Sequence, residues 1–197
     1  MENGLFWFSG WDRGVFVIIN QAFTSGFFNL LMPVLSNLIV WLVPLGLVWI
    51  VFMFRATRRG RIIALCCFLV VAATDQLASS VIKPIVNRER PCNVVPQTHL
   101  YLDGKWQVTD KFGLTTYKSS ASFPSSHAAN IAGQAMYWAY FYPQLSPVLI
   151  LAAVSVGFSR VYLGVHWPSD VLAGYLLGVV IALVIAFPLR AWILPEE

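Results

Sequence analysis

The chain has 197 residues and a formal net charge of +4; 58% of its residues are hydrophobic and only 11% are charged. Soluble domains carry about twice that charged share. This composition, with a mean hydropathy of +0.69, leaves too little polar surface to cover a water-soluble globule and argues against a soluble helical protein.

Residues 5–24 mix Phe and Trp with four charged or amide side chains, Asp12, Arg13, Asn20 and Gln21. Charge in the middle of a membrane-spanning helix is costly. The pattern therefore favours an amphipathic helix that lies in the membrane interface. A sixth spanning helix is the alternative for this segment. No basic residue precedes an apolar stretch at the amino terminus, so a cleaved signal peptide is not expected.

Five apolar segments follow that have the length and composition of transmembrane helices. We expect them within 27–54, with a bend near Pro33, within 62–83, and at about 125–142, 146–163 and 168–189. The polar segment 84–124, rich in Ser, Thr and Lys, is expected to lie outside the membrane. The predicted fold class is all-α: residues 1–197 form a single polytopic membrane helix bundle.

The segment 55–61, between the first two spans, contains four arginines. Basic loops stay on the cytoplasmic side. Counting through the spans then places 84–124 and the first residues of the third and fifth helices on the outer side. Six side chains should meet at that surface: Lys83, Arg90, His127, Arg160, His166 and Asp170. We expect a bacterial inner membrane, with these residues facing the periplasm or the exterior.

His127 and His166 both lie where a predicted helix begins. The amino terminus of a helix has unpaired N–H groups and the positive end of the helix dipole, which attract anions. Together with Lys83, Arg90 and Arg160, two such ends could hold a phosphate group of charge about −1.5 to −2. The pattern predicts a phosphate-binding site.

Phosphoryl transfer needs a nucleophile and an acid for the leaving oxygen. Asp170 follows His166 by four residues, so its carboxylate can accept from one ring nitrogen and leave the other free to attack phosphorus. His127 could protonate the leaving group. Asp170 could instead only cap its helix, but the catalytic role is favoured. Clustered carboxylates are missing and the three cysteines have no metal or disulfide spacing, so neither a metal nor another cofactor is expected.

Three motifs resemble the signatures of the type 2 phosphatidic acid phosphatase family. Residues 83–91 read KPIVNRERP, similar to a lysine, six residues and Arg-Pro. Residues 124–127 read PSSH, similar to Pro-Ser-Gly-His, with Ser126 in place of the glycine. Residues 159–170 read SRVYLGVHWPSD, similar to Ser-Arg, five residues, His, three residues and Asp. Three motifs in this order are a highly specific match over 83–170.

The resemblance implies that five residues would bind the phosphate: Lys83, Arg90, Ser125, His127 and Arg160. It also implies that His127 is the general acid, that His166 forms a phosphohistidine, and that Asp170 supports it. Ser126 is a further candidate, since its side chain either points away from the phosphate or adds a hydrogen bond through its hydroxyl.

The predicted function is metal-independent dephosphorylation of a lipid phosphate or diphosphate at the outer membrane face. Undecaprenyl diphosphate is the first choice of substrate, followed by phosphatidylglycerophosphate, phosphatidate and the phosphates of lipid A. A lipid phosphotransferase with the same intermediate is the alternative, and a membrane transporter is less favoured. The expected partners are the lipid substrate and the bilayer, and no nucleic acid.

Three further residues have less definite interpretations. Arg88 and Glu89 are expected to be solvated loop residues. Asp75 lies about two turns before Lys83 within the second span, where a carboxylate is a functional candidate. A structural hydrogen bond to Asn130 or Gln134 is the equally weighted alternative, so Asp75 is not counted among the catalytic residues.

Overall fold

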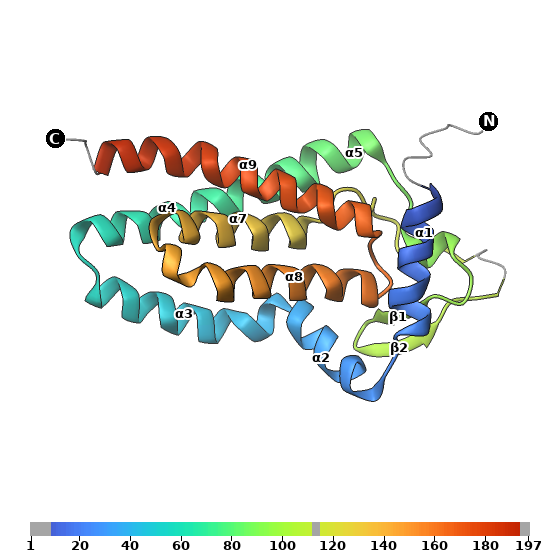
Figure 1. The fold of residues 1–197 in the computed structure, drawn as a ribbon. Helices are drawn as coiled ribbons and strands as arrows, with labels where there is room; N and C mark the ends of the chain where they lie inside the picture. Colours follow the sequence, from blue (N-terminus) through green and yellow to red (C-terminus); the bar gives the residue numbers. More distant parts are fainter. Residues whose placement is uncertain (1–8, 112–114, 194–197) are drawn as a thin grey trace.

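The structure is a computed structural model that describes residues 9–111 and 115–193. Long apolar helices run side by side along one axis, and a short helix and a β-hairpin cover one end of them (Figure 1). Four helical stretches among the described residues are long and apolar enough to cross a bilayer: Leu38–Arg55, Arg58–Val94, Pro143–Tyr162 and Pro168–Ile193. The predicted polytopic membrane helix bundle is confirmed.

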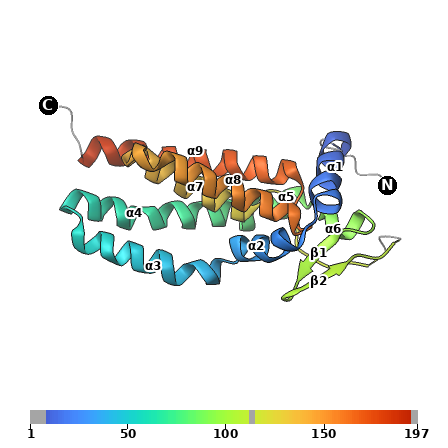
Figure 2. The ribbon, with the colours of Figure 1, turned by 60° about the horizontal axis from the view of Figure 1, so that its bottom comes forward.

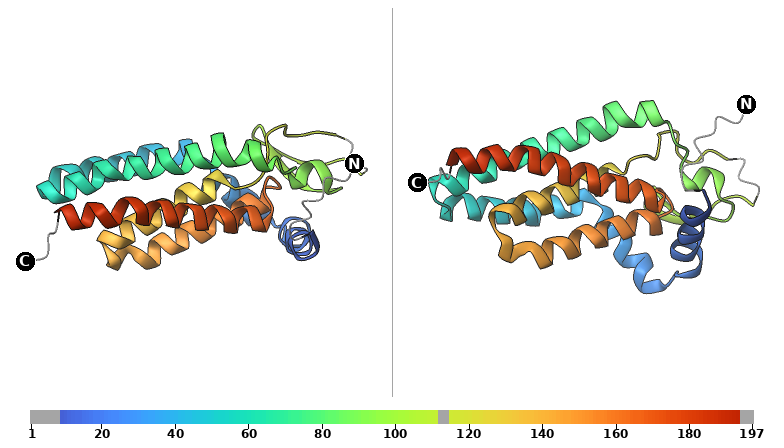
Figure 3. Two further views of the ribbon diagram at one scale, coloured as in Figure 1. Left: turned by 90° about the horizontal axis from the view of Figure 1, so that it is seen from above. Right: turned by 45° about the horizontal axis from the view of Figure 1, so that its top comes forward.

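The amino-terminal segment lies across the end of the bundle. It comprises α1 (Ser9–Val17), the π-helical turn η1 (Ile18–Ala22) and α2 (Gly26–Ser36). The helical axis bends by 117° between η1 and α2. Seen from above the bundle, α1 points along the line of sight while the long helices run across it (Figure 3). α1 therefore runs across the direction of the long helices.

The first predicted span is broken, but not at Pro33. That proline lies inside α2, and the helix ends at Asn37. Asn37 is extended, with φ −90° and ψ 102°, and its side chain accepts a hydrogen bond of 3.0 Å from the Ile39 amide. Asparagine is a preferred residue for starting a helix, so a second helix, α3 (Leu38–Arg55), begins directly afterwards.

The second predicted span, 62–83, is part of one helical stretch. α4 (Arg58–Asp75) continues through the π-helical η2 (Gln76–Ile82) into α5 (Lys83–Val86). A short helix, α6 (Pro91–Val94), follows. The basic first turn of α4 and the polar segment after α5 therefore lie at opposite ends of the bundle (Figure 1).

The last three helices begin and end close to their predicted residues. They are α7 (Ser126–Phe141), α8 (Ser146–Tyr162) and α9 (Pro168–Ile193), with the 3₁₀ turn η3 (Pro143–Leu145) between the first two. Because α7 and α9 both begin at the end of the bundle across which α1 lies, the residues at their amino termini meet there (Figure 1).

Two glycines let α7 and α9 pack backbone against backbone. A Cβ atom at Gly178 would lie 2.1 Å from the carbonyl oxygen of Ala129, and one at Gly174 would lie 2.5 Å from that of Ser125. At the amino termini of these two helices, the Ser125 amide donates a hydrogen bond of 2.9 Å to the carbonyl oxygen of Asp170. This contact fixes the start of α7 relative to the first turn of α9.

The polar segment 84–124 contains a hairpin that the sequence analysis did not predict. β1 (His99–Leu102) pairs antiparallel with β2 (Lys105–Val108). Asp103 and Gly104 between them both have positive φ, of 51° and 79°, and Asp-Gly is a strong hairpin signal. The hairpin lies beside α1 beyond the end of the long helices (Figure 2).

Candidate active site

The eight predicted site residues come together at the end of the bundle that α1 and the hairpin cover. They are Lys83, Arg90, Ser125, Ser126, His127, Arg160, His166 and Asp170, and each one contacts another member of the set or interacts with it electrostatically. The arginine-rich turn between α3 and α4 lies at the opposite end (Figure 1).

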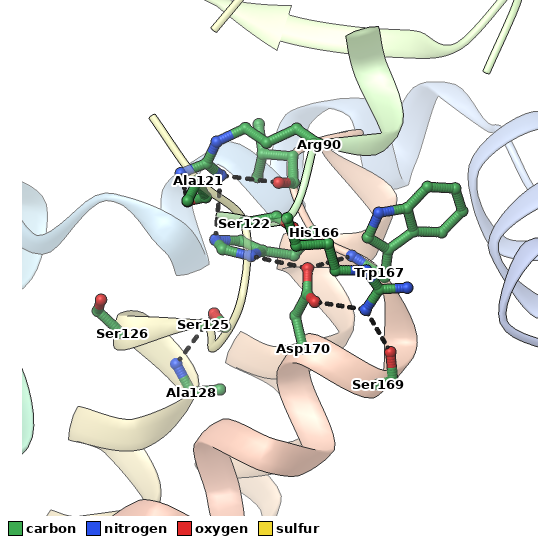
Figure 4. Close-up of polar contacts among 12 residues, drawn as sticks. Arg90, Ala121, Ser122, Ser125, Ser126, Ala128, His166, Trp167, Ser169 and Asp170 are labelled. Carbon is green, nitrogen blue, oxygen red and sulfur yellow. Dashed lines mark hydrogen bonds and ion pairs between the residues drawn. The ribbon is translucent and has the colours of Figure 1, made fainter. Parts of the chain in front are cut away.

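His166 lies in the connection between α8 and α9, and its side chain is buried. Its Nδ1 is 3.4 Å from Oδ2 of Asp170, at ion-pair distance and without a hydrogen bond. Its Nε2 is 3.3 Å from Nη1 of Arg90 (Figure 4). With the carboxylate on the Nδ1 side, the Nε2 lone pair faces the arginine side of the ring.

Gly164 turns the chain from α8 toward His166. Its φ is +79°, and a Cβ atom there would lie 2.8 Å from Cγ2 of Thr98 and 2.9 Å from the carbonyl oxygen of His99. Glycine adopts positive φ without a steric penalty. A larger residue at this position would displace the connection that contains the imidazole.

Asp170 is fully buried in the first turn of α9. Its Oδ2 accepts a hydrogen bond of 2.9 Å from the Trp167 amide, which is the capping contact that the sequence offered as the alternative. The same oxygen is the one nearest to His166. Capping and orientation of the imidazole therefore occur together, because the cap holds the carboxylate in place beside the ring.

Arg90 is buried and its guanidinium donates mainly to backbone carbonyls. The acceptors are the carbonyl oxygens of Ser120, Ala121 and Val165, at 2.8, 3.0 and 2.8 Å, and the Ser120 hydroxyl at 3.0 Å. These bonds hold the segment before α7 against the site. The remaining contact, from Nη1 to His166, points at the imidazole.

Lys83 is joined to the start of α7 by its ammonium group. Its Nζ donates a hydrogen bond of 2.8 Å to the Ser126 hydroxyl, which is also 3.0 Å from the Ser79 hydroxyl. The Ser126 side chain therefore points toward the lysine. The Ser125 oxygen accepts from the Ala128 amide and caps α7, so its proton stays available for another acceptor.

Arg160, at the end of α8, has a donor that no protein group satisfies. Its Nη1 contacts the Ser36 hydroxyl, whereas its Nε is buried and has no hydrogen-bond partner in the structure. Buried polar atoms nearly always have a partner. His127 lies within electrostatic reach of Arg160, and its side chain is exposed. The unsatisfied donor next to an accessible imidazole indicates a place for an anion.

The positive charges around the site affect the ionisation of nearby groups. Burial, together with the charges of Arg160 and Arg90, lowers the pKa of His166 well below its usual value. Burial, followed by the charges of Arg90 and Arg160, also lowers the pKa of Lys118 in the polar segment 84–124. Without a bound anion, His166 is therefore neutral at neutral pH and its free nitrogen can act as a nucleophile.

Comparison with known proteins decides the family. The model of the PAP2 superfamily matches residues 64–191, which is most of the chain and includes all eight site residues. The chain belongs to the PAP2 superfamily.

Two proteins represent the PAP2 relatives that are similar in sequence. The chain is 34% identical over 122 residues to a lipid A 4'-phosphatase of Bacteroides thetaiotaomicron, which covers 59% of this chain and 51% of the relative. It is 32% identical over 152 residues to an undecaprenyl-diphosphatase of Sulfolobus acidocaldarius, with coverages of 73% and 66%. The chain thus spans between half and two thirds of the length of these relatives.

A solved structure with the same fold is that of a transmembrane PAP2-type phosphatidylglycerolphosphate phosphatase from Bacillus subtilis. The TM-score is 0.63 at 26% sequence identity, and the match covers 90% of this chain and 83% of the other. The match therefore extends beyond the PAP2 motifs to nearly the whole helix bundle.

Arg88, between the lysine and arginine of the first PAP2 motif, is not the solvated loop residue that the sequence predicted. Its side chain is 20% exposed and forms ion pairs with Asp170 at 2.7 Å and with Asp12 at 2.5 Å. Its guanidinium also lies 5.1 Å from the ring centre of Trp167. The prediction was wrong because Asp12 lies 76 residues away in the sequence. Glu89 is exposed, as expected.

Asp75 lies deeper in the same span as the first PAP2 motif. The two structural partners proposed for it are engaged elsewhere: Asn130 contacts Thr74, and Gln134 donates to a backbone carbonyl of α4. Asp75 instead accepts a long hydrogen bond of 3.5 Å from Ser79. The hydrogen bond to Asn130 or Gln134 is therefore contradicted. Within residues 9–111 and 115–193, Asp75 hydrogen-bonds to none of the eight site residues, and it interacts electrostatically with Lys83.

Proposed function

We propose that this protein is a lipid phosphatase that transfers the phosphate of a lipid phosphate or diphosphate to His166 and then to water. One observation carries the proposal: the His166 imidazole lies between the Asp170 carboxylate and the Arg90 guanidinium, in a site where the Nε of Arg160 has no partner. A phosphate oxygen would satisfy that donor, and the phosphorus would then face a neutral imidazole.

In the first step, the Nε2 lone pair of His166 attacks phosphorus and the bond from phosphorus to the leaving oxygen breaks. The electron pair of that bond passes to the leaving oxygen, which takes a proton from His127. Asp170 accepts from the Nδ1–H group of the ring and stabilises its growing positive charge. The products are a phosphohistidine and the lipid with one phosphate fewer, which is an alcohol when the substrate is a monophosphate and a lipid monophosphate when the substrate is a diphosphate.

In the second step, a water molecule attacks phosphorus and gives a proton to His127. The phosphorus–nitrogen bond breaks, its electron pair returns to Nε2, and inorganic phosphate leaves. The exposed position of His127 allows water to reach it. His127 is close to several cations, so its protonated form needs the negative charge of the bound phosphate.

The phosphate would be bound by protein cations and hydroxyl groups, without a metal or another cofactor. Lys83, Arg90 and Arg160 would neutralise the equatorial oxygens, and Ser125 and Ser126 would add hydroxyl donors. Among residues 9–111 and 115–193, no three His, Cys, Asp or Glu side chains are placed to hold a metal ion. These side chains would stabilise the negative charge that the phosphoryl oxygens carry in the transition state.

The site would face the outer side of a bacterial inner membrane. The basic residues of the α3–α4 turn lie at the other end of the bundle, where the charge bias of membrane proteins places the cytoplasm. The names of the relatives include undecaprenyl-diphosphatase, phosphatidylglycerolphosphate phosphatase and lipid A phosphatase. We propose undecaprenyl diphosphate as the first substrate, followed by phosphatidylglycerophosphate, phosphatidate and lipid A.

A panel of lipid phosphates tests this function. We expect the purified protein to release phosphate from the panel, with the highest kcat/KM for undecaprenyl diphosphate. Activity in EDTA should stay within about twofold of the untreated rate, because no step uses a metal ion. Orthovanadate, which mimics five-coordinate phosphorus, should inhibit. If the protein releases no phosphate from any of these lipids, the proposed function is refuted. Complete loss of activity in EDTA would refute the claim that the reaction needs no metal.

A further inference from the structure

A buried series of ion pairs connects the amino-terminal helix with the His166 imidazole. Oδ2 of Asp12, in α1, lies 2.5 Å from Nη2 of Arg88. Nη1 of the same guanidinium lies 2.7 Å from Oδ1 of Asp170, whose other oxygen faces Nδ1 of His166 at 3.4 Å. Asp12 is 1% exposed and Asp170 is 0% exposed, while Arg88 is 20% exposed, so solvent screens these interactions less than it would on the protein surface.

Asp12 also holds the first turn of α9 directly. Its Oδ1 accepts a hydrogen bond of 2.9 Å from the Ser169 amide, and its Oδ2 accepts one of 2.5 Å from the Ser169 hydroxyl. Ser169 precedes Asp170 in the chain, and its hydroxyl in turn lies 2.6 Å from Nη1 of Arg88. The unpaired N–H groups at the start of a helix favour such a carboxylate.

Further contacts keep α1 in place on the bundle. The ring of Phe16 packs against that of Trp167, with ring centres 5.4 Å apart. The Asn20 amide, at the end of the same segment, donates to the carbonyl oxygens of His99 and Tyr162, both at 2.8 Å. Asp12 thus approaches the site from a helix that is fixed to the hairpin and to α8.

We propose that Asp12 is a positioning residue for the His166–Asp170 pair, acting through Arg88; this inference rests on the function proposed above. The segment that contains Asp12 lies outside residues 64–191, which carry the family match. Two carboxylates share the Arg88 guanidinium, so its position is fixed from both sides. Without the Asp12 charge, Arg88 can reorient. Asp170 then loses the ion pair at its Oδ1, which together with the Trp167 amide keeps Oδ2 directed at the imidazole.

The test compares Asp12→Asn with the wild-type protein. We expect kcat to fall by about 10- to 100-fold, the range for losing an orienting partner of a site residue, with KM within about threefold of wild type. Asparagine keeps the size of the side chain, and it removes the charge. Glu89→Gln is the matched control, because it makes the same carboxylate-to-amide change at an exposed side chain nearby and should keep wild-type kcat.

A double-mutant cycle separates positioning from general destabilisation. In an Asp170→Asn background, Asp12→Asn should cause less than about a twofold further loss of kcat, because its effect passes through Asp170. An equal fold loss in both backgrounds would overturn the inference, as would unchanged kcat in Asp12→Asn alone. Arg88→Gln interrupts the series at its middle and should behave in the same way if Asp12→Asn does not fold.

Wild-type turnover in the same assay distinguishes the two proposals. Active wild-type protein with unaffected Asp12→Asn would overturn only the positioning role. Wild-type protein without turnover would refute the proposed function. In that case, the affinity for orthovanadate, measured by calorimetry, tests whether Asp12 positions the His166–Asp170 pair. We expect Asp12→Asn to bind orthovanadate about tenfold more weakly than wild type and Glu89→Gln to bind it equally. Equal binding by all three proteins, or no binding by wild type, would overturn the inference.

Discussion

His166→Ala should lower kcat for the lipid phosphate by about 10⁴-fold or more, because the variant has no group that can form the covalent intermediate. Phosphate release, measured with enough protein to detect the residual rate, gives the size of the loss. The side chain is buried, so thermal unfolding should be recorded in parallel to show that the helix bundle is intact.

His99→Gln is the matched control for this substitution. His99 is in β1 at the same end of the bundle, and its ring stacks on that of Trp106 with centres 4.2 Å apart. It contacts none of the eight site residues directly, so its replacement should leave kcat within about threefold of wild type. A His166→Ala variant as active as His99→Gln would place the nucleophile elsewhere.

Arg160→Gln should have the second largest effect. Its buried Nε is the donor that no protein group satisfies, and a group of this kind stabilises the charge of the transition state. Removing one such donor lowers kcat by about 10²- to 10³-fold. Arg190→Gln, at the other end of the bundle, removes an arginine that lies over the ring of Tyr140 and should leave kcat unchanged.

Arg160→Gln should also change how kcat/KM depends on pH. Arg160 contributes, after burial, to lowering the pKa of His166. In wild type, the neutral nucleophile therefore persists below about pH 6.5, where a free histidine would be protonated. Loss of the Arg160 charge raises that pKa, so the acidic limb of kcat/KM should move to higher pH. A limb that stays in place or moves to lower pH would contradict the assigned role of Arg160.

Much of the bundle and the position of the site could be predicted from the sequence. Apolar segments of this length are typical of membrane-spanning helices, and the polar or proline residues that flank them indicate where each helix begins. α7, α8 and α9 therefore begin within a few residues of their predicted starts. The arginines of 55–61 predicted which side faces the cytoplasm, and alternation of the spans predicted that His127 and His166 lie at one end of the bundle. This inference needed no knowledge of side-chain contacts.

The contacts between distant segments could not be predicted. The pair of Arg88 with Asp12 joins residues 76 apart, and the contact of Arg160 with Ser36 joins residues 124 apart. No local pattern reports such partners, because each depends on how α1 and α2 fold back over the end of the bundle that holds the candidate site. The hairpin differs from these contacts, because its Asp103-Gly104 turn is a local signal in the sequence.

Chemical identification of the phosphorylated residue tests the central claim most directly. The wild-type protein would be mixed with a lipid phosphate labelled at phosphorus, quenched in alkali within milliseconds and digested, and the labelled peptide sequenced. We predict acid-labile label on His166, absent in His166→Ala and present in His99→Gln. Label on any other residue, or steady turnover with no labelled protein at any quench time, would contradict this account.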